Sequence, residues 1–190
     1  MDTKLTGKTR IESDLIGARE IPAEALYGVQ TLRGIENFSI SKFRLSEYPL
    51  FIKGLAITKM AAAMANFELG LLTVEQKDAI IAACGEILDG KHHDQFPVDM
   101  IQGGAGTTTN MNANEVIANR ALELMGHERG EYQYCSPNDH VNCSQSTNDA
   151  YPTAIHIGMY FKHLQLLPHL EELIASFRKK GEEFSQIIKM

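Results

Sequence analysis

Residues 149–188 read DAYPTAIHIGMYFKHLQLLPHLEELIASFRKKGEEFSQII, with apolar side chains mostly three or four positions apart. The apolar series comprises Ile155, Met159, Phe161, Leu164, Leu167, Leu170, Ile174, Phe177, Phe184 and Ile188. This spacing predicts one amphipathic helix, about 55–60 Å long at 1.5 Å per residue. Such a helix cannot bury its own apolar stripe and needs partner helices. We therefore predict a mainly α fold, in which residues 1–148 form an N-terminal domain and 149–190 begin a central helical-bundle domain.

Three shorter helices are predicted upstream of this segment. The first covers about 49–70 and opens on a proline, whose missing N–H costs nothing in a first helical turn. The second covers about 74–88, because Thr73 and Gln76 have the spacing of a capping box. The third is predicted from about 112 to 125, where a glycine ends it.

The remaining segments are predicted to be mostly irregular. Residues 1–48 carry frequent turn signals, with short extended pieces around Asp14 and a short helix near 31–37. Long loops are predicted at 91–109 and at 127–148. Both loops end in a polar segment that opens the next helix.

These polar segments are residues 102–112, QGGAGTTTNMN, and residues 145–149, QSTND. Both are dense in hydroxyl and amide groups, and neither contains Lys or Arg. A glycine-rich turn exposes backbone N–H groups, and the helix that follows adds the positive end of its dipole. If the two helix ends face one cleft, they form a pocket for a carboxylate.

Each polar segment also has a purely structural interpretation. The turn at 103–109 can be a capping cluster for the helix after it, and the residues alone leave both interpretations open. The run at 146–149 is a good N-cap set, which is the commoner role for such a run. One side chain can cap a helix while its neighbours face a pocket, so the two roles do not exclude each other.

Composition excludes several classes of partner. The chain has 190 residues, of which 44% are hydrophobic, and a formal net charge of −6. It has no basic stripe to neutralise phosphates, so we expect no nucleic-acid partner. No apolar run approaches the ~18 residues of a membrane span, and the start of the chain lacks the apolar stretch of a signal peptide. We therefore expect no membrane association and a cytoplasmic location.

The cysteines and histidines predict neither disulfides nor a metal site. Cys84, Cys135 and Cys143 are odd in number and form no C-x-x-C pair, which is typical of reduced thiols in the cytoplasm. His92 and His93 are adjacent and point in different directions on most backbones. No H-E-x-x-H or comparable set of ligands occurs.

Residues 91–149, which contain both polar segments, carry three basic and eight acidic residues. Cations that neutralise an anionic ligand must therefore come from elsewhere.

Several motifs taken together resemble the aspartase/fumarase superfamily. The full set lies in residues 10–17, 27–33, 37–38, 95–99, 103–119, 124–127, 137–142 and 145–153. Fumarases usually carry a loop of the form G-S-G-T-Q-S-N-M-N, whereas residues 104–112 here read GAGTTTNMN. With QFPVD at 95–99 and GEY at 130–132, the resemblance favours the aspartase branch.

The resemblance implies reversible deamination of L-aspartate to fumarate and ammonia, without an organic cofactor. It implies a homotetramer in which each active site combines segments of three subunits. The residues implied to bind the substrate carboxylates and amino group are Thr107, Ser146, Thr147 and Asn148, with Gly106, Thr108 and Asn110 in supporting positions. Residues 136–139 resemble a second dicarboxylate site of fumarases, although they also form an ordinary turn signal.

The resemblance also implies that the catalytic residues lie outside this chain. A general-base serine and a lysine that neutralises the substrate are expected beyond residue 190, so we expect an N-terminal portion without turnover of its own. Two alternatives stay open: a class II fumarase acting on malate, and a non-catalytic module for small-anion binding or assembly.

Overall fold

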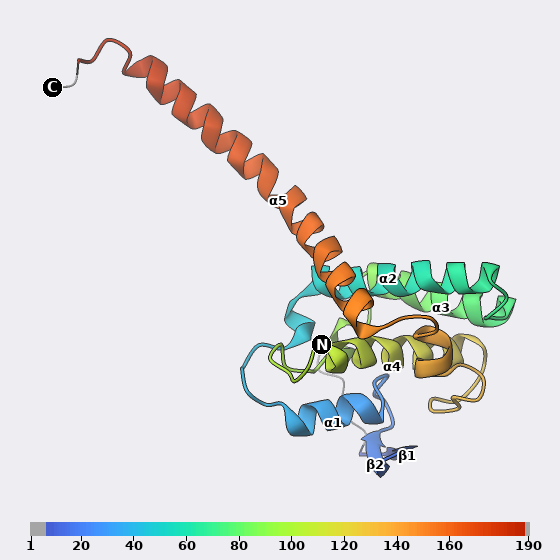
Figure 1. The fold of residues 1–190 in the computed structure, drawn as a ribbon. Helices are drawn as coiled ribbons and strands as arrows, with labels where there is room; N and C mark the ends of the chain where they lie inside the picture. Colours follow the sequence, from blue (N-terminus) through green and yellow to red (C-terminus); the bar gives the residue numbers. More distant parts are fainter. Residues whose placement is uncertain (1–6, 189–190) are drawn as a thin grey trace.

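The structure, a computed structural model, describes residues 7–188 and is mainly α-helical, as predicted (Figure 1). A short antiparallel hairpin precedes the helices, and short 3-10 or π-helical turns lie between them. The elements in chain order are β1 (Thr9–Asp14), β2 (Gly17–Pro22), α1 (Val29–Asn37), η1 (Leu45–Glu47), α2 (Pro49–Glu68), α3 (Val74–Leu88), η2 (His93–Gln95), α4 (Thr107–Leu124), η3 (Pro137–Val141) and α5 (Thr147–Glu183).

Helices α2, α3 and α4 form the body of the molecule. α3 packs on both α2 and α4, α1 lies against α4, and the hairpin packs on α1 (Figure 1). The sides that face one another bury an aliphatic core, which includes Ile52, Leu55, Ile80, Ile117 and Leu122. Burial of this apolar surface is the main force that holds the helices together.

The predicted helix starts at Pro49 and Thr73 are confirmed. Pro49 occupies the first turn of α2. Thr73 Oγ1 accepts the N–H of Gln76 at 3.1 Å, and Gln76 Oε1 accepts the N–H of Thr73 at 3.1 Å. These reciprocal bonds satisfy two N–H groups that have no partner inside the helix.

Other predicted boundaries are wrong. α4 begins at Thr107 rather than near 112. The prediction missed this start because the first turn of the helix is polar and shows no apolar periodicity. α5 covers Thr147–Glu183 rather than 149–188. The segment at 127–148, predicted as a loop, contains η3. The division into domains after residue 148 stays a prediction.

A buried carboxylate from α4 caps the start of α1. Glu115, 2% exposed, accepts the N–H groups of Gly28 at 2.9 Å, Gln30 at 2.8 Å and Thr31 at 3.0 Å. Its Oε2 also accepts the Thr31 hydroxyl at 2.6 Å. Because the first N–H groups of a helix lack partners within it, this side chain ties α1 to α4.

α2 is the one helix within residues 7–188 that is long and apolar enough, by length and composition, to cross a membrane. The expectation that no segment passes this test is therefore wrong for residues 49–68. α2 nevertheless packs against α3 and α5 and buries Ile52, Leu55 and Ala63 among others. Such burial is typical of a core helix.

α5 crosses α2 at two glycines. A Cβ on Gly54 would overlap the carbonyl oxygen of Ala154, and a Cβ on Gly158 would lie 3.1 Å from the carbonyl oxygen of Leu50. A Cβ cannot fit at Gly54, and a Cβ at Gly158 would require the neighbouring backbone to shift. The two backbones therefore approach closely, and this contact fixes where the first turns of α5 lie.

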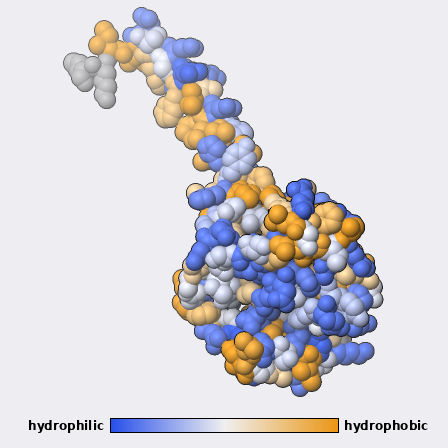
Figure 2. All heavy atoms as spheres, turned by 45° about the vertical axis from the view of Figure 1, so that its right-hand side comes forward, coloured by the Kyte–Doolittle hydropathy of each residue, from blue (hydrophilic) through white to orange (hydrophobic). Residues whose placement is uncertain are grey.

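Beyond this crossing α5 projects from the body as an arm, which we define as residues 159–183 (Figure 1). Figure 2 shows orange apolar side chains along much of its visible face. The exposed apolar residues of the arm are Met159, Tyr160, Leu164, Leu166, Leu167, Leu170, Leu173, Ile174 and Phe177. The predicted stripe is thus uncovered in this chain.

Replacing Gly54 with alanine is expected to weaken the crossing. The methyl group meets backbone that cannot rotate away, so we expect a loss of about 1–3 kcal/mol in the free energy of unfolding. The measurement is urea denaturation, with amide exchange of residues 150–158 to locate the effect. Gly85→Ala is the matched control, because a Cβ there meets nothing within 4 Å. A helical alanine in open space is expected to be neutral or stabilising, and equal losses in both variants would contradict the close crossing.

Candidate functional site

The glycine-rich segment forms the turn that leads into α4. Gly104 and Gly106 have positive φ values of 72° and 90°, a conformation that favours glycine. In addition, a Cβ on Gly106 would overlap the ring of Tyr151 from α5. Gly106 is therefore required both by the backbone conformation and by the close approach of an aromatic ring.

The side chain of Gln102 bridges the two ends of this turn. Its Oε1 accepts the N–H of Thr109 at 2.9 Å, and its Nε2 donates to Thr109 Oγ1 at 2.7 Å. Gly106 supplies no side-chain cap, so Gln102 caps α4 from a distance. Within residues 7–188 the N–H groups of Thr107 and Thr108 have no hydrogen-bond partner and stay available at this helix end.

Asp99 holds the segment that precedes the turn. Its buried carboxylate accepts the N–H groups of Ile40 at 3.0 Å, Ser41 at 2.6 Å and Ile101 at 2.8 Å, and the Ser41 hydroxyl at 2.7 Å. Burial alone raises the pKa of Asp99, but these four donors outweigh burial and lower the pKa to about 2. The ionised carboxylate therefore fixes residues 100–102 against the chain that leads to α2.

The second polar segment opens α5. Ser146 Oγ accepts the N–H of Asn148 at 3.1 Å, and Asp149 Oδ2 accepts the N–H of Ser146 at 3.2 Å. This capping box confirms the capping interpretation for Ser146. Thr147 Oγ1 accepts a bond from Nδ2 of Asn110 at 3.3 Å, which joins the start of α5 to the start of α4.

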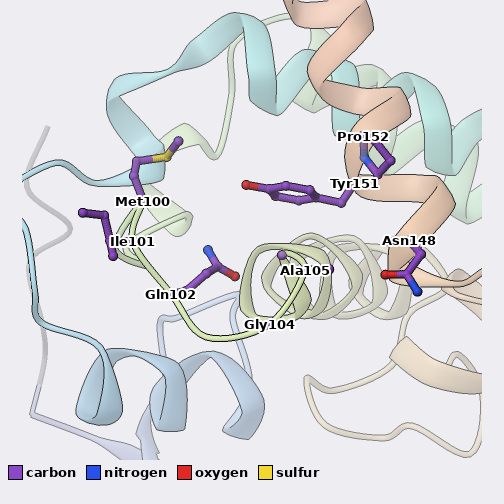
Figure 3. Close-up of a pocket in the computed structure, with 9 residues that line it drawn as sticks. Met100, Ile101, Gln102, Gly104, Ala105, Asn148, Tyr151 and Pro152 are labelled. Carbon is purple, nitrogen blue, oxygen red and sulfur yellow. The ribbon is translucent and has the colours of Figure 1, made fainter.

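The two polar segments border one pocket of about 470 Å³ (Figure 3). Its lining residues are Met100, Ile101, Gln102, Gly104, Ala105, Gly106, Asn148, Tyr151 and Pro152. The Tyr151 ring extends from α5 across the turn, toward Met100 and Gln102 (Figure 3). The predicted site residues Asn148 and Gly106 thus border one hollow, which is large enough to admit a small organic acid.

The other predicted site residues lie beside or behind this pocket. Thr107 is exposed on the first turn of α4. The Thr108 side chain packs on Gly34 of α1 instead, where a Cβ would overlap its methyl group. Asn110 is buried behind the turn. The roles of these residues in substrate binding stay predictions.

A buried cation lies behind the pocket. Lys59 of α2 has no exposed surface, and its Nζ donates to Asn110 Oδ1 at 2.7 Å, Asn142 Oδ1 at 2.9 Å and Gln145 Oε1 at 3.0 Å. Burial lowers the pKa of Lys59 to about 7. The sequence places Lys59 on the apolar face of its helix, and a lysine within such a face is the signal that identifies it.

No group of three or more His, Cys, Asp or Glu side chains within residues 7–188 is arranged to hold a metal ion. The three cysteines are free thiols, and burial raises the pKa of Cys84 and Cys135 to about 12. Neither of these two thiols is therefore a ready nucleophile.

Residues 136–139 form a capped turn. Ser136 Oγ accepts the N–H of Asp139 at 3.1 Å and donates to Asp139 Oδ2 at 2.9 Å. The turn signal at 136–139 thus marks the capped start of η3, and the second dicarboxylate site implied by the resemblance stays a prediction.

Residues 17–190 match the protein family described as Lyase. The chain belongs to the Lyase family. It is 58% identical over 181 residues to the aspartate ammonia-lyase of Pseudomonas canavaninivorans, covering 95% of this chain and 38% of that protein. With the aspartate ammonia-lyase of Escherichia coli (strain K12) it shares 55% identity over 187 residues, covering 98% of this chain and 39% of that protein. The Lyase-family chain thus spans well under half the length of these relatives.

Solved structures of lyases share the fold. A fumarate lyase:delta crystallin from Brucella melitensis superposes with a TM-score of 0.92 at 52% identity, covering 96% of this chain and 43% of that one. A class II fumarase from Schistosoma mansoni gives a TM-score of 0.89 at 37% identity, covering 96% and 38%. The aspartase/fumarase resemblance of the sequence is therefore confirmed.

Proposed function

We propose that this chain supplies the dicarboxylate-binding segments of an aspartate ammonia-lyase, which converts L-aspartate reversibly to fumarate and ammonia. The observation that carries the proposal is the pocket between the starts of α4 and α5, with Gly106 on one side and Asn148 on the other. The identity of 55–58% to aspartate ammonia-lyases, against 37% to a class II fumarase, favours aspartate over malate.

The chemistry of this reaction suits the groups around the pocket. Removal of a proton beside a carboxylate builds negative charge on that carboxylate, which fixed hydrogen-bond donors stabilise. The free N–H groups of Thr107 and Thr108 and the side chain of Asn148 are donors of this kind. The base that removes the proton is, by the resemblance, a serine beyond residue 190.

The proposal includes a homotetramer in the cytoplasm. Support for assembly comes from the arm, whose apolar residues need covering by other helices. Support for the location comes from the three free thiols, which are typical of a reducing compartment.

A chimera tests the proposal directly. Residues 1–190 would replace the aligned segment of the Escherichia coli aspartate ammonia-lyase, and fumarate would be followed by its ultraviolet absorbance. We expect the folded chimera to form fumarate from L-aspartate, and the isolated chain to form none, because by the resemblance the general base is a serine outside residues 1–190.

A second chimera carries Thr147→Val, which keeps the shape of the side chain but removes its hydroxyl group. We expect its turnover to fall by about 10²-fold, as for the loss of one transition-state donor. A folded chimera that prefers malate would instead support a fumarase, and one that is inactive on both substrates would favour a non-catalytic anion-binding module.

A further inference from the structure

Lys59 differs from an ordinary buried lysine in the nature of its partners. Its Nζ binds three neutral amide oxygens, from Asn110, Asn142 and Gln145, and its side chain is fully buried. An ammonium group has three donors and no acceptor, so all three of its bonds are used. A buried charge is retained only where such bonds compensate for its lost hydration.

The ammonium group fixes the orientation of the amides around it. Because it can only donate, each amide must turn its oxygen toward Nζ and its NH₂ group away. Asn142 Nδ2 accordingly donates to the carbonyl of Gln145 at 3.1 Å, and Gln145 Nε2 to the carbonyls of Val141 at 2.9 Å and Cys143 at 3.1 Å. The segment that leads into α5 is thus ordered around the lysine.

The third amide carries this orientation to the start of α5. Asn110 Nδ2 donates to Asn142 Oδ1 at 3.0 Å and to Thr147 Oγ1 at 3.3 Å. A hydroxyl that accepts a bond keeps its own hydrogen free to donate elsewhere. The chain of bonds from Lys59 through Asn110 therefore leaves Thr147 as a donor beside the pocket.

We propose that Lys59 is a positioning residue of the dicarboxylate site: through Asn110 it orients the Thr147 hydroxyl as a donor to a ligand carboxylate, and its positive charge lies behind that donor. The inference rests on the proposed function and deepens it, since it identifies the cation that residues 91–149 lack. Lys59 does not touch the ligand, because its own donors are all occupied.

The charge of Lys59 depends on pH. Burial lowers the pKa to about 7, while the carboxylate of Asp149 on α5 and the thiol of Cys84 on α3 act in the opposite direction. The groups that α4 and residues 142–145 bring to Nζ are neutral amides. His140 of η3 bonds to Ser136 and Gln76 instead. Above this pKa Lys59 is neutral, and the negative charge of Asp149 is no longer balanced near the site.

The test measures binding of succinate, a non-reacting dicarboxylate, to the 190-residue chain by amide NMR from pH 6 to pH 8.5. In the same samples the Lys59 side chain, labelled with ¹³C at Cε, reports its own titration. We expect the affinity for succinate to fall as pH rises, and the midpoint of this fall to coincide with the midpoint of the Lys59 titration. We also expect the side-chain NH₂ signals of Asn110 to shift with that midpoint, whether or not succinate is present.

Lys59→Met keeps the length of the side chain and removes the charge and the donors. We expect succinate to bind about tenfold more weakly at pH 6. Its affinity should no longer change over the pH interval in which Lys59 titrates in the wild type. Lys53→Met is the matched control, because it removes the same charge from the same helix outside the amide cluster. We expect it to keep both the affinity and the pH profile of the wild type.

The outcomes separate the inference from the proposed function. Succinate binding that ignores the Lys59 titration, or that survives Lys59→Met unchanged, overturns the role of Lys59 and leaves the dicarboxylate site standing. Asn110 signals that do not follow the Lys59 titration overturn the role of Lys59 even without a ligand. Failure of the wild type to bind succinate, with Asn110 responding as expected, overturns the dicarboxylate site alone. If Lys59→Met does not fold, the wild-type titrations still decide.

Discussion

Glu115→Ala is expected to be the most destabilising single substitution in the body of this protein. The alanine leaves four donors without a partner: the N–H groups of Gly28, Gln30 and Thr31, and the Thr31 hydroxyl. A buried donor left without a partner costs about 1–3 kcal/mol, so several such donors together cost about 3–5 kcal/mol. We expect a loss of that size in the free energy of unfolding by urea, with early loss of amide protection in α1.

Glu115→Gln separates shape from hydrogen bonding. Glutamine fits the same space, but its NH₂ group turns toward N–H donors, so one bond is replaced by a clash of like groups. We expect a loss of about 1–3 kcal/mol. Burial raises the pKa of Glu115, whereas its four bonds lower it. Because the net pKa is raised, folding favours the protonated side chain: its contribution to stability is complete below the unfolded pKa, and part of it is lost as pH rises through the folded pKa.

Glu123→Ala is the matched control for Glu115. It removes the same side chain from the same helix, at a position where the carboxylate pairs with Arg120 and Arg129 near the surface. Such pairs contribute about 0–1 kcal/mol. A Glu115→Ala loss no larger than that of Glu123→Ala would show that α1 does not depend on this carboxylate.

Gly106→Ala is expected to abolish the pocket. The methyl group adds the strain of a positive φ and overlaps the ring of Tyr151, so either the turn or the ring must move. Both border the cavity. We expect succinate binding to weaken by more than about 100-fold, equal to about 2.7 kcal/mol, as measured by the same NMR titration.

Gly104→Ala provides the comparison. It has a similar positive φ of 72°, but a Cβ there meets only Thr107 Oγ1 at 3.7 Å. We expect it to carry the backbone strain without the overlap, and to bind succinate more tightly than Gly106→Ala. In the double variant Gly106→Ala with Tyr151→Ala the overlap is relieved, so part of the lost binding should return. Equal weakening by both glycine variants would place the effect in the backbone alone.

Much of the architecture follows from local patterns in the sequence. The starts of α2 and α3 are encoded by a proline and by the Thr73–Gln76 pair, and the arm by its apolar repeat. The start of α4 is not encoded locally. Its cap comes from Gln102, which reaches across a glycine turn that sequence rules assign to a loop.

The site shows the same division. The two polar segments and their meeting at one pocket follow from helix ends and glycine content. The sequence shows Lys59 only as a lysine on an apolar helix face; its role does not follow, because its partners Asn142 and Gln145 lie more than 80 residues away in sequence. The Thr108 backbone N–H was predicted to support the site and stays a prediction, whereas the packing of the Thr108 side chain on Gly34 of α1 was not predicted. Contacts between distant segments decide both cases, and no local pattern contains them.

The crossing of α2 and α5 has a mechanical consequence. α5 meets α2 near Ala154, about 9 Å along the axis from Asn148 and about 44 Å from Glu183, at 1.5 Å per residue. If α5 moves as a rigid rod about this point, despite Pro168 in the arm, the displacement of its near end is about one fifth of that of its far tip. A partner that binds the tip of the arm would therefore also restrict the positions of Asn148 and Tyr151. A displacement of several ångströms at the tip corresponds to less than one ångström at the start of α5.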